Sequence, residues 1–359
     1  MLAVLTIGAP TAAMAHGKKS SADLAEAANE LIATFDHEKK GDALFSFADK
    51  ERSSWHFFPD RMRKNNPRKG LPYMSMTNQQ KELTKNLLQM LLTSHAFNEL
   101  EDIRIIHGLH GDWDAADNPR HRYYVSIFGK PSTNHSWGFS FEGHHLSLNC
   151  TLIGGRHFAV TPSFWGASPV TVKNGPRKGI ETFKKERYAA IKLVNTFSED
   201  QSVQAMLEKR RGPGTSGKVN RNVYLPPSGI RYTDLDDKQQ GFLLELVRAF
   251  AHKYRPDVIK EIAGRKKIED TSTMTFAYVP GSNKYVRHFR IQTEEYLIEF
   301  DNPGDNHVHS AWRDFDGDFG RDLIAEHLKA AHSKHEPNKP VAKKPVPPGK
   351  PVTGIDLKD

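Results

Sequence analysis

The sequence has almost no cysteine and no long hydrophobic run. Cys150 is the one cysteine among 359 residues, so no disulfide can form within the chain, and an exported form would depend on its hydrophobic core. No apolar stretch reaches the roughly 20 residues that a membrane-spanning helix needs, and we therefore expect no membrane span. A P-loop, a dinucleotide-binding glycine motif and a G-x-S-x-G motif are also missing. These absences exclude the best-marked nucleotide-binding enzymes and serine hydrolases.

The excess positive charge is spread over the two ends of the chain. The formal net charge is +8, and several of the basic residues are Lys18-Lys19 and the lysines of residues 338–350. Dispersed charge without an aromatic-basic recognition motif argues against nucleic acid as a partner. A hydrophobic content of 37% over 359 residues is enough for a domain with a substantial core.

Composition divides the chain into three parts. Residues 1–15 are apolar, then small, and they end in Ala13-Met14-Ala15, an A-x-A-type cleavage site. We interpret them as a signal peptide that lacks its basic first part, which predicts a periplasmic or secreted protein. Residues 336–359 are rich in lysine and proline and are predicted to form a disordered tail. Residues 16–335 are predicted to form a single domain.

Helix and strand patterns alternate in this domain and predict an α+β fold. A capping box begins a leucine-rich helix over 77–93, and a similar helix is predicted over 237–254. Period-two patterns predict antiparallel strands after each helix. Residues 77–150 resemble residues 237–302, at an offset of 160 for the helices and 152 for the strands. We therefore expect two pseudo-repeated helix-plus-antiparallel-strand units that form one compact body.

The first cluster of chemically active side chains is Glu142-Gly143-His144-His145. The bulky apolar residues switch from odd to even positions at Gly143, which is the pattern of a β-bulge. Beyond the bulge, His145 is predicted to share a face with polar Ser147 and Asn149, and His144 to point with the apolar residues. One histidine would then be a metal ligand, and the other a neighbour of the site or a core residue.

The second cluster is His307-Val308-His309, which places two imidazoles on one face of a strand. Asp301 precedes it, and residues 302–305 have the composition of a turn. We expect this turn to fold back and bring the two clusters together. Imidazole-rich sites suit zinc, copper or iron, so the expected cofactor is a transition metal ion. Its expected ligands are His144, His145, His307 and His309.

Two classes of function fit these clusters. The first is a metal-dependent hydrolase or oxidoreductase for a small molecule, in which an open coordination position activates water or dioxygen. Its expected catalytic residues are Glu142, Asp301, Arg313 and Asp314. The second is a non-catalytic binding module for a glycan or peptide, in which the histidines are structural. Its expected binding residues are Phe164, Trp165, Trp312 and Asn149.

Arg313 and Asp314 have a structural alternative of their own. They equally fit an ion pair that holds the strand to the last predicted helix, which begins at Asp318. The sequence does not indicate the oligomeric state.

Two motifs are specific in combination: Gly-His-His-Leu-Ser-Leu-Asn at 143–149 and Asn-His-Val-His-Ser-Ala-Trp-Arg-Asp at 306–314. With them the chain resembles the bacterial family catalogued as domain of unknown function 3500, from about residue 25 to about residue 330. Other matching segments are 55–59, 76–88, 123–129 and 161–167. The resemblance implies an exported bacterial protein and no established activity. The chain departs from the family in its short lead peptide, its Lys/Pro tail and the charged Arg287-His288.

Overall fold

The structure is a computed structural model that describes residues 11–63, 67–109, 122–207, 226–266, 268, 270–281, 286–304 and 306–326. The predicted tail, 336–359, and residues 1–10 of the predicted signal peptide lie outside these ranges. Residues 11–15 of that peptide belong to the first helix. None of the helices in the described ranges is long and apolar enough to cross a membrane.

The labelled α-helices occur in pairs along the chain. They are α1 (Thr11–Ala33), α2 (His37–Ala43), α3 (Asn78–Leu91), α4 (Ser94–His107), α5 (Lys184–Val194), α6 (Glu199–Ala205), α7 (Asp237–Ala251) and α8 (Pro256–Arg265). The strands are β1 (Leu44–Phe45), β2 (Leu71–Pro72), β3 (Tyr123–Phe128), β4 (Trp137–Gly143), β5 (Leu146–Ile153), β6 (His157–Ala159), β7 (Ser163–Ala167), β8 (Ile230–Arg231), β9 (Thr275–Pro280), β10 (Val286–Gln292), β11 (Tyr296–Gly304) and β12 (His307–Asp314).

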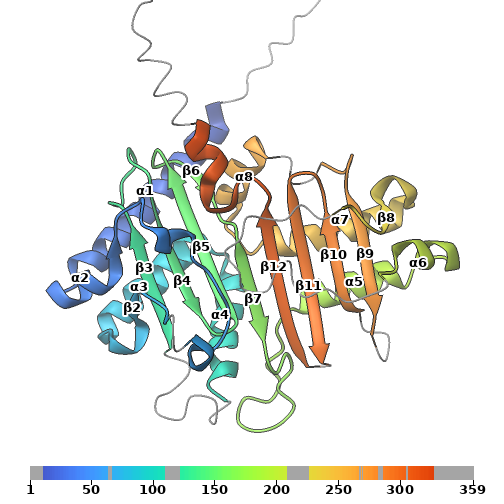
Figure 1. The fold of residues 1–359 in the computed structure, drawn as a ribbon, viewed down its shortest axis with the longest axis horizontal. Coiled ribbons are helices and arrows are strands. Elements are labelled where there is room, and N and C mark those ends of the chain that lie inside the picture. Colours follow the sequence, from blue (N-terminus) through green and yellow to red (C-terminus); the bar gives the residue numbers. More distant parts are fainter. Residues whose placement is uncertain are drawn as a thin grey trace, which may run out of the picture.

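These strands form one twelve-stranded sheet (Figure 1). Its order is β1-β3-β4-β5-β7-β12-β11-β10-β9-β8, with β2 beside β3 and β6 beside β5. The pair β1–β3 is parallel, whereas pairs such as β5–β7 and β7–β12 are antiparallel, so the sheet is mixed. Helices and a large mixed sheet confirm the predicted α+β class. In this order β7 joins the strands of the first half of the chain to those of the second.

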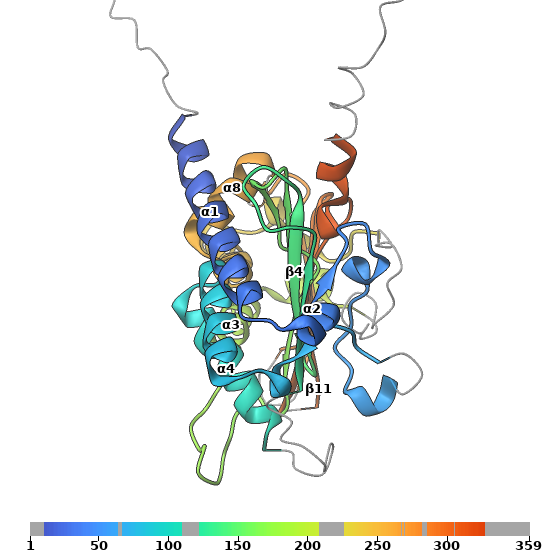
Figure 2. The same ribbon diagram turned by 90° about the vertical axis from the view of Figure 1, so that its left-hand side faces the viewer.

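The two faces of the sheet bury different kinds of side chain. Trp137, Phe139 and Phe141 of β4 belong to the main hydrophobic core, since alternate residues of a strand share a face. Figure 2 shows the sheet edge-on, with α1, α3, α4 and α8 beside one face. Ser140 and Glu142, which point to the other face, are also buried. The face opposite to these helices is therefore polar and yet shielded from water.

The two halves of the chain contain similar elements in the same order. In each half a two-residue strand and a 3₁₀ turn precede a helix with a capping box, formed by Thr77 with Gln80 and by Asp236 with Gln239. The first box confirms the predicted helix start, and the second begins one residue before Asp237. A further helix and antiparallel strands follow in both halves. This order agrees with the predicted internal repeat, which itself stays a prediction.

The halves meet where α3 ends and α7 ends. Leu92 and Tyr254 form an isolated antiparallel bridge. The Thr93 N–H donates to the carbonyl of Lys253, and the Arg255 N–H donates to that of Leu91, each at 3.0 Å. The backbone therefore connects the halves on the helical side of the sheet as well as within it.

A buried ion cluster lies at this junction. The ammonium of Lys253, a residue that is 4% exposed, donates to Glu99 and, at 2.7 Å, to Glu186. Burial lowers the pKa of Lys253, but the two carboxylates outweigh it and raise the pKa. Burial raises the pKa of Glu99, but Lys253 outweighs it and lowers the pKa. Burial also raises the pKa of Glu186. At this residue the effect of burial is larger than the opposing effect of Lys253, so the pKa stays raised. Two carboxylates thus depend on one lysine for their compensation.

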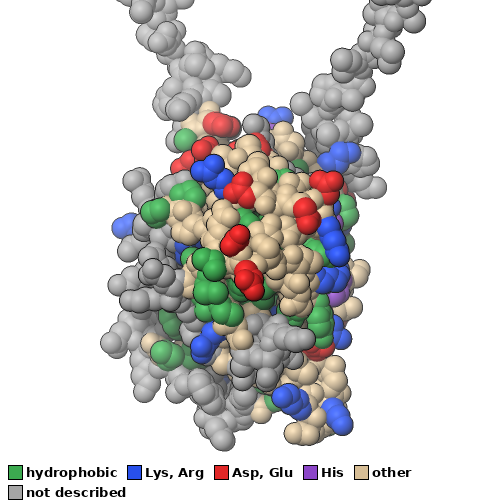
Figure 3. Space-filling view, turned by 90° about the vertical axis from the view of Figure 1, so that its right-hand side faces the viewer, with side chains coloured by type: hydrophobic (Ala, Val, Ile, Leu, Met, Phe, Trp, Pro, Cys, Tyr) green, Lys and Arg blue, Asp and Glu red, His purple; other side chains and the backbone are tan. Residues whose placement is uncertain are grey.

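The far edge of the sheet ends in β8, which is only two residues long. Figure 3 looks at this end of the molecule and shows acidic and basic side chains mixed over it. A short edge strand among charged side chains limits pairing with further strands. This edge of the sheet is therefore too short for extensive pairing with a strand of another molecule.

Candidate metal centre

His145 lies in the tight turn between β4 and β5. Gly143 pairs directly with Leu146, so His144 and His145 form a two-residue hairpin loop. The predicted β-bulge at Gly143 is therefore wrong, because the apolar positions change parity where the chain reverses. Paired residues of a hairpin share a face, so an odd position in one strand accompanies an even position in the next. The sequence pattern alone does not separate a bulge from such a reversal.

The backbone of His145 is held on both sides. Its φ is 64°, in the left-handed region that is uncommon for residues other than glycine. Its N–H donates to the carbonyl of Phe57 at 3.1 Å, and its carbonyl accepts the N–H of Gly166 at 2.7 Å. Strained backbone of this kind persists where the surrounding contacts hold it in place. The turn therefore presents the imidazole in a defined direction.

His307 and His309 lie on β12, directly after the hairpin from β11. His309 pairs with Asp301, and His307 pairs with Gly304. Val308 between them belongs to the main core, so both histidines point to the polar face. The chain thus folds back after β11, as predicted, but residues 302–304 of the predicted turn belong to β11 itself, so the reversal comes later than the turn composition predicts.

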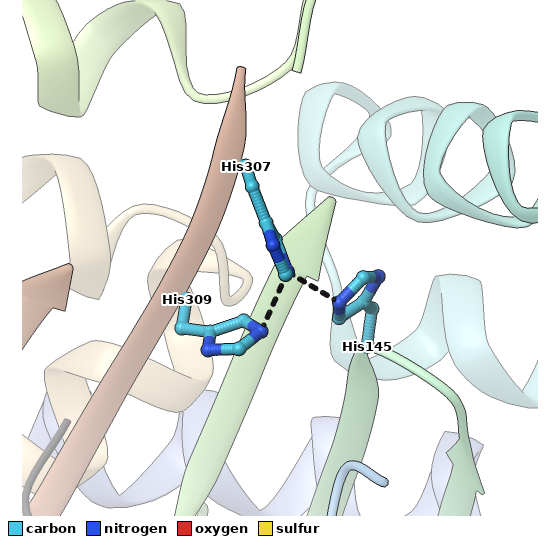
Figure 4. Close-up of side chains that lie close together, drawn as sticks. All are labelled: His145, His307 and His309. Atoms are coloured by element: carbon cyan, nitrogen blue, oxygen red, sulfur yellow. Dashed lines mark hydrogen bonds between the residues drawn. The ribbon is translucent and has the colours of Figure 1, made fainter. Parts of the chain in front are cut away.

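The three imidazoles converge through their Nε2 atoms (Figure 4). Nε2 of His307 lies 3.0 Å from Nε2 of His145 and 2.9 Å from Nε2 of His309. A potential ligand nitrogen of each lies within 4.8 Å of the other two. An imidazole nitrogen carries one hydrogen or one in-plane lone pair, so it makes one directed hydrogen bond. The two short contacts of His307 Nε2 therefore compete for one hydrogen or one lone pair, and the three converging nitrogens could hold one metal ion.

Gly166 of β7 lies between the imidazoles. It hydrogen-bonds to His145 in the turn before β5 and pairs with His309 on β12. A Cβ at this position would lie 3.1 Å from Cδ2 of His145, 3.2 Å from Cδ2 of His309 and 2.8 Å from the carbonyl oxygen of Val308. These distances are shorter than normal carbon contacts, so the absence of a side chain lets the two rings approach each other.

Aromatic side chains form a wall beside the histidines. The rings of Phe57 and Phe164 stack with 3.9 Å between centroids and 4° between planes. The His309 ring lies 4.9 Å from Phe57 and 5.5 Å from Phe164. Phe58 stacks on Phe57 from the other side. We call Phe57, Phe58 and Phe164 the aromatic wall; it gives the imidazoles an apolar neighbour.

Two of the residues that build this centre, Phe57 and Gly166, are not among the site residues predicted from the sequence. The signal that could have found them is their presence in the family-like segments 55–59 and 161–167. Their roles depend on strand neighbours far away in the sequence.

His144 is not one of the converging imidazoles. Its Nδ1 lies 3.1 Å from Nε2 of His107, and its ring stacks on that of His145 with 3.9 Å between centroids. Burial, and after it the charge of His107, lowers the pKa of His144 to about 2. The structure therefore brings together three of the four predicted ligands and leaves His144 as a neutral neighbour.

The electrostatic surroundings keep His145 neutral as well. Burial comes first and the charges of His144 and His309 second in holding the pKa of His145 well below its usual range. Neutral imidazole is the form that binds a metal ion, because the ligand nitrogen needs its lone pair. His145 is therefore in the form that binds a metal ion.

Glu142 and Asn149 lie on the polar face but bond within the sheet. The hydroxyl of Ser147 donates to Oε1 of Glu142 at 2.6 Å. Nδ2 of Asn149 donates to the carbonyl of Pro162 at 3.0 Å. These hydrogen bonds hold β4, β5 and the segment before β7 together.

Arg313 and Asp314 make the contacts that their structural alternative predicts. Nε of Arg313 donates to Asp318 at 2.6 Å, and its guanidinium lies 5.0 Å from the Trp55 ring centroid. Asp314 accepts the N–H of Gly317 at 2.6 Å and pairs with Lys266 at 3.1 Å. These bonds hold the end of β12 to the turn that follows.

The aromatic residues expected to line a binding groove are all buried. Phe164 is 0% exposed, Trp165 2% and Trp312 6%. Phe164 belongs to the aromatic wall, whereas Trp165 and Trp312 belong to the main core. In their present positions these rings offer no open surface to a glycan or peptide.

Asp301 lies beside the centre on the polar face. It pairs with His309 on one side and with His288 of β10 on the other. Its Oδ1 lies 3.6 Å from Nδ1 of His288, and both residues are at most 1% exposed. A buried carboxylate thus lies between two histidine-bearing strands.

Comparison with known proteins gives one match. Residues 17–321 match the family described as Protein of unknown function (DUF3500). No curated protein and no solved structure matches the chain. The match confirms the resemblance indicated by the two histidine motifs.

Proposed function

We propose that this chain, which belongs to the DUF3500 family, is a metal-dependent enzyme centred on His145, His307 and His309. The observation that carries the proposal is the pair of short contacts at Nε2 of His307, at 3.0 and 2.9 Å. Zinc–nitrogen bonds of about 2.0–2.1 Å place neighbouring ligand nitrogens about 3–4 Å apart. The observed separations lie at the short end of this range.

The donor set favours a transition metal. It consists of three imidazole nitrogens, which suit zinc, copper or iron and are poor ligands for magnesium or calcium. Three protein ligands leave a position open, which is the arrangement of catalytic rather than structural zinc sites. The proposed ion therefore has room for a water molecule or a substrate atom.

The open position defines the reaction class. A bound zinc ion would supply an activated water for hydrolysis or hydration, and a bound copper or iron ion would supply a site for dioxygen. The chain's own contribution is to hold His145 neutral and to place the aromatic wall beside the imidazoles, because electrostatic interactions are stronger where water is excluded. We take a small molecule as the substrate, since Phe164, Trp165 and Trp312, the rings expected to line a groove for a polymer, are buried.

The proposed location is outside the cytoplasm. Its support is the apolar lead sequence ending in Ala13-Met14-Ala15. A site made of histidines alone is also insensitive to the thiol chemistry that an oxidising compartment imposes on cysteine ligands.

Metal analysis of protein produced without a histidine tag tests the proposal. We expect about one equivalent of zinc, copper or iron per chain, removable by a chelator and restored by one of these metals. If zinc restores full occupancy, activity screens would use hydrolytic substrates. If copper or iron restores it, they would use oxidative substrates. A chain that stays metal-free in the presence of all three ions contradicts the proposal and leaves the non-catalytic binding module.

A further inference from the structure

The polar face carries a row of residues that continues beyond the three histidines. His145 hydrogen-bonds to Gly166, Gly166 pairs with His309, His309 pairs with Asp301, and Asp301 pairs with His288. The row therefore runs from the β4–β5 turn across β7, β12, β11 and β10 on one face. Gly166 is its one member without a side chain, and Asp301 is its one carboxylate.

The position of Asp301 matches the nitrogen of His309 that does not face the other imidazoles. Nε2 of His309, the nitrogen far from the backbone, contacts His307, and Figure 4 shows the second nitrogen turned away from it. That second nitrogen, Nδ1, is close to the strand. Aspartate has a short side chain, so its carboxylate stays near the backbone. On the strand paired with His309, such a carboxylate lies at about the same distance from the sheet as Nδ1 of that ring. Directly paired residues of antiparallel strands have Cβ atoms about 4.5–5.5 Å apart.

His288 completes the row on the other side of the carboxylate. Its side chain is 0% exposed, and neither ring nitrogen makes a hydrogen bond. A buried polar group without a hydrogen bond costs about 1–3 kcal/mol, so such groups are rare unless they serve a purpose. The 3.6 Å separation from Asp301 Oδ1 is slightly longer than a hydrogen bond.

We propose that Asp301 is a positioning residue for the metal centre, and that His288 in turn positions Asp301. The carboxylate accepts the Nδ1–H of His309, which fixes the tautomer whose Nε2 lone pair faces the ion. Carboxylates that bond the outer nitrogen of a metal-bound histidine orient the ring and increase its basicity. This inference rests on the proposed metal centre and extends it to β10 and β11.

Cobalt(II) is the probe for the experiment, because its visible d–d bands report the geometry of the ligands. Untagged wild type, D301N, D301E and H288Q are loaded with cobalt, and affinity is measured by competition with a chelator. We expect D301N to bind about 10–100-fold more weakly and to shift the bands, as changes beside metal ligands do. D301E keeps the charge and is expected to recover part of the affinity, and H288Q is expected to lose less affinity than D301N.

E299Q is the matched control. Glu299 lies on the same strand and face and is 1% exposed, but it pairs with Ala311 instead of a histidine and bonds to Arg290. Its substitution is expected to leave the cobalt bands unchanged, even if it lowers the melting temperature.

The outcomes separate this inference from the proposed centre. D301N with wild-type affinity and bands overturns the positioning role, and so does E299Q with the same spectral shift as D301N. If D301N does not fold, H288Q decides, since wild-type affinity and unchanged bands in that variant overturn the role of the Asp301–His288 pair. Wild type that binds no cobalt contradicts the metal centre itself.

Discussion

His145 and His307 are 162 positions apart in the chain, and their Nε2 atoms lie 3.0 Å apart. One lies in the turn after β4 and the other at the start of β12, and β7 between them joins the two halves of the sheet. The three nitrogens therefore come together only when both halves are folded. An ion bound to them would bind the folded chain and not the unfolded one.

Metal is accordingly expected to stabilise the chain. Preferential binding to the folded state adds RT ln(1 + [L]/Kd), which is about 2.7 kcal/mol at a free metal concentration of 100 Kd. Thermal unfolding followed by circular dichroism, with and without added zinc, measures the effect. A melting temperature that does not respond to zinc, copper or iron argues against a site that needs both halves.

Replacing His307 and His309 together with alanine is expected to abolish metal binding. Only His145 would remain, and one imidazole does not hold an ion at micromolar concentration. Both side chains are only partly buried, so the circular dichroism spectrum should stay that of the wild type. Elemental analysis measures the bound metal, and H135A, at an exposed loop histidine, is the control. Retention of about one equivalent in the double variant would place the ion elsewhere.

Gly166→Ala is expected to damage the centre by steric contact. The added Cβ would meet the Val308 carbonyl oxygen at 2.8 Å and both neighbouring imidazoles near 3.1 Å. Overpacking of this kind costs about 1–3 kcal/mol in the free energy of unfolding, and here it also separates the rings. Urea unfolding and metal affinity are the two measurements, and both should fall.

Gly241→Ala is the matched control for that substitution. Gly241 lies in α7 with nothing within 4 Å of the added atom. Alanine there is expected to stabilise the chain by about 0.5–1 kcal/mol without changing metal affinity. Equal effects of the two substitutions would remove the steric argument.

Local patterns predict the parts of this molecule that depend on neighbouring residues. The capping box at Thr77 predicts the start of α3, and period-two patterns predict the long strands. The His-x-His spacing places His307 and His309 on one face, which is what β12 shows. The parity switch at Gly143 is a real signal, but a hairpin and a bulge produce the same alternation. The prediction of a bulge is therefore wrong because the same sequence pattern fits both a bulge and a hairpin.

The rest of the centre depends on strand order, which no local pattern contains. β7 comes after β5 and β6 in the chain and pairs with both β5 and the distant β12, and this places Gly166 between His145 and His309. Phe57 arrives from an irregular segment before β2 and stacks on Phe164. A glycine and a phenylalanine are common residues, and their value here depends on distant partners: His309 is 143 positions from Gly166, and Phe164 is 107 positions from Phe57.

The N-terminal prediction concerns processing. If Ala13-Met14-Ala15 is a cleavage site, the mature chain begins at His16 and is found outside the cytoplasm. Intact mass measurement of the native protein, with cell fractionation, tests this. A native chain that retains Met1 would contradict the export proposal, and it would leave the metal centre unaffected.

Lys253→Met is expected to destabilise the chain in a pH-dependent way. The substitution leaves Glu99 and Glu186 buried without their cation, and breaking a buried ion pair from one side costs about 3–5 kcal/mol. The cost should be largest near pH 8 and smaller near pH 5, where protonation removes the uncompensated charges. Urea unfolding at both pH values measures the difference. K192M is the control, since Lys192 and Glu245 form an exposed pair worth about 0–1 kcal/mol.

The wild-type pH window follows from the directions of the pKa shifts. The pKa of Glu99 is lowered in the folded chain, so its stabilisation is present above the ordinary pKa of about 4.3 and is lost as the pH falls through the lowered value. The pKa of Lys253 is raised, so its stabilisation is present below the ordinary pKa of about 10.4 and is lost as the pH rises through the raised value. The pKa of Glu186 is raised as well, so its proton is retained at a higher pH than in the unfolded chain. Glu99 and Lys253 should therefore stabilise the wild type between about pH 4.3 and about pH 10.4, whereas Glu186 contributes stability at low pH that is lost as the pH rises. Equal destabilisation of K253M at pH 5 and pH 8 would show that the carboxylates are not the source of the cost.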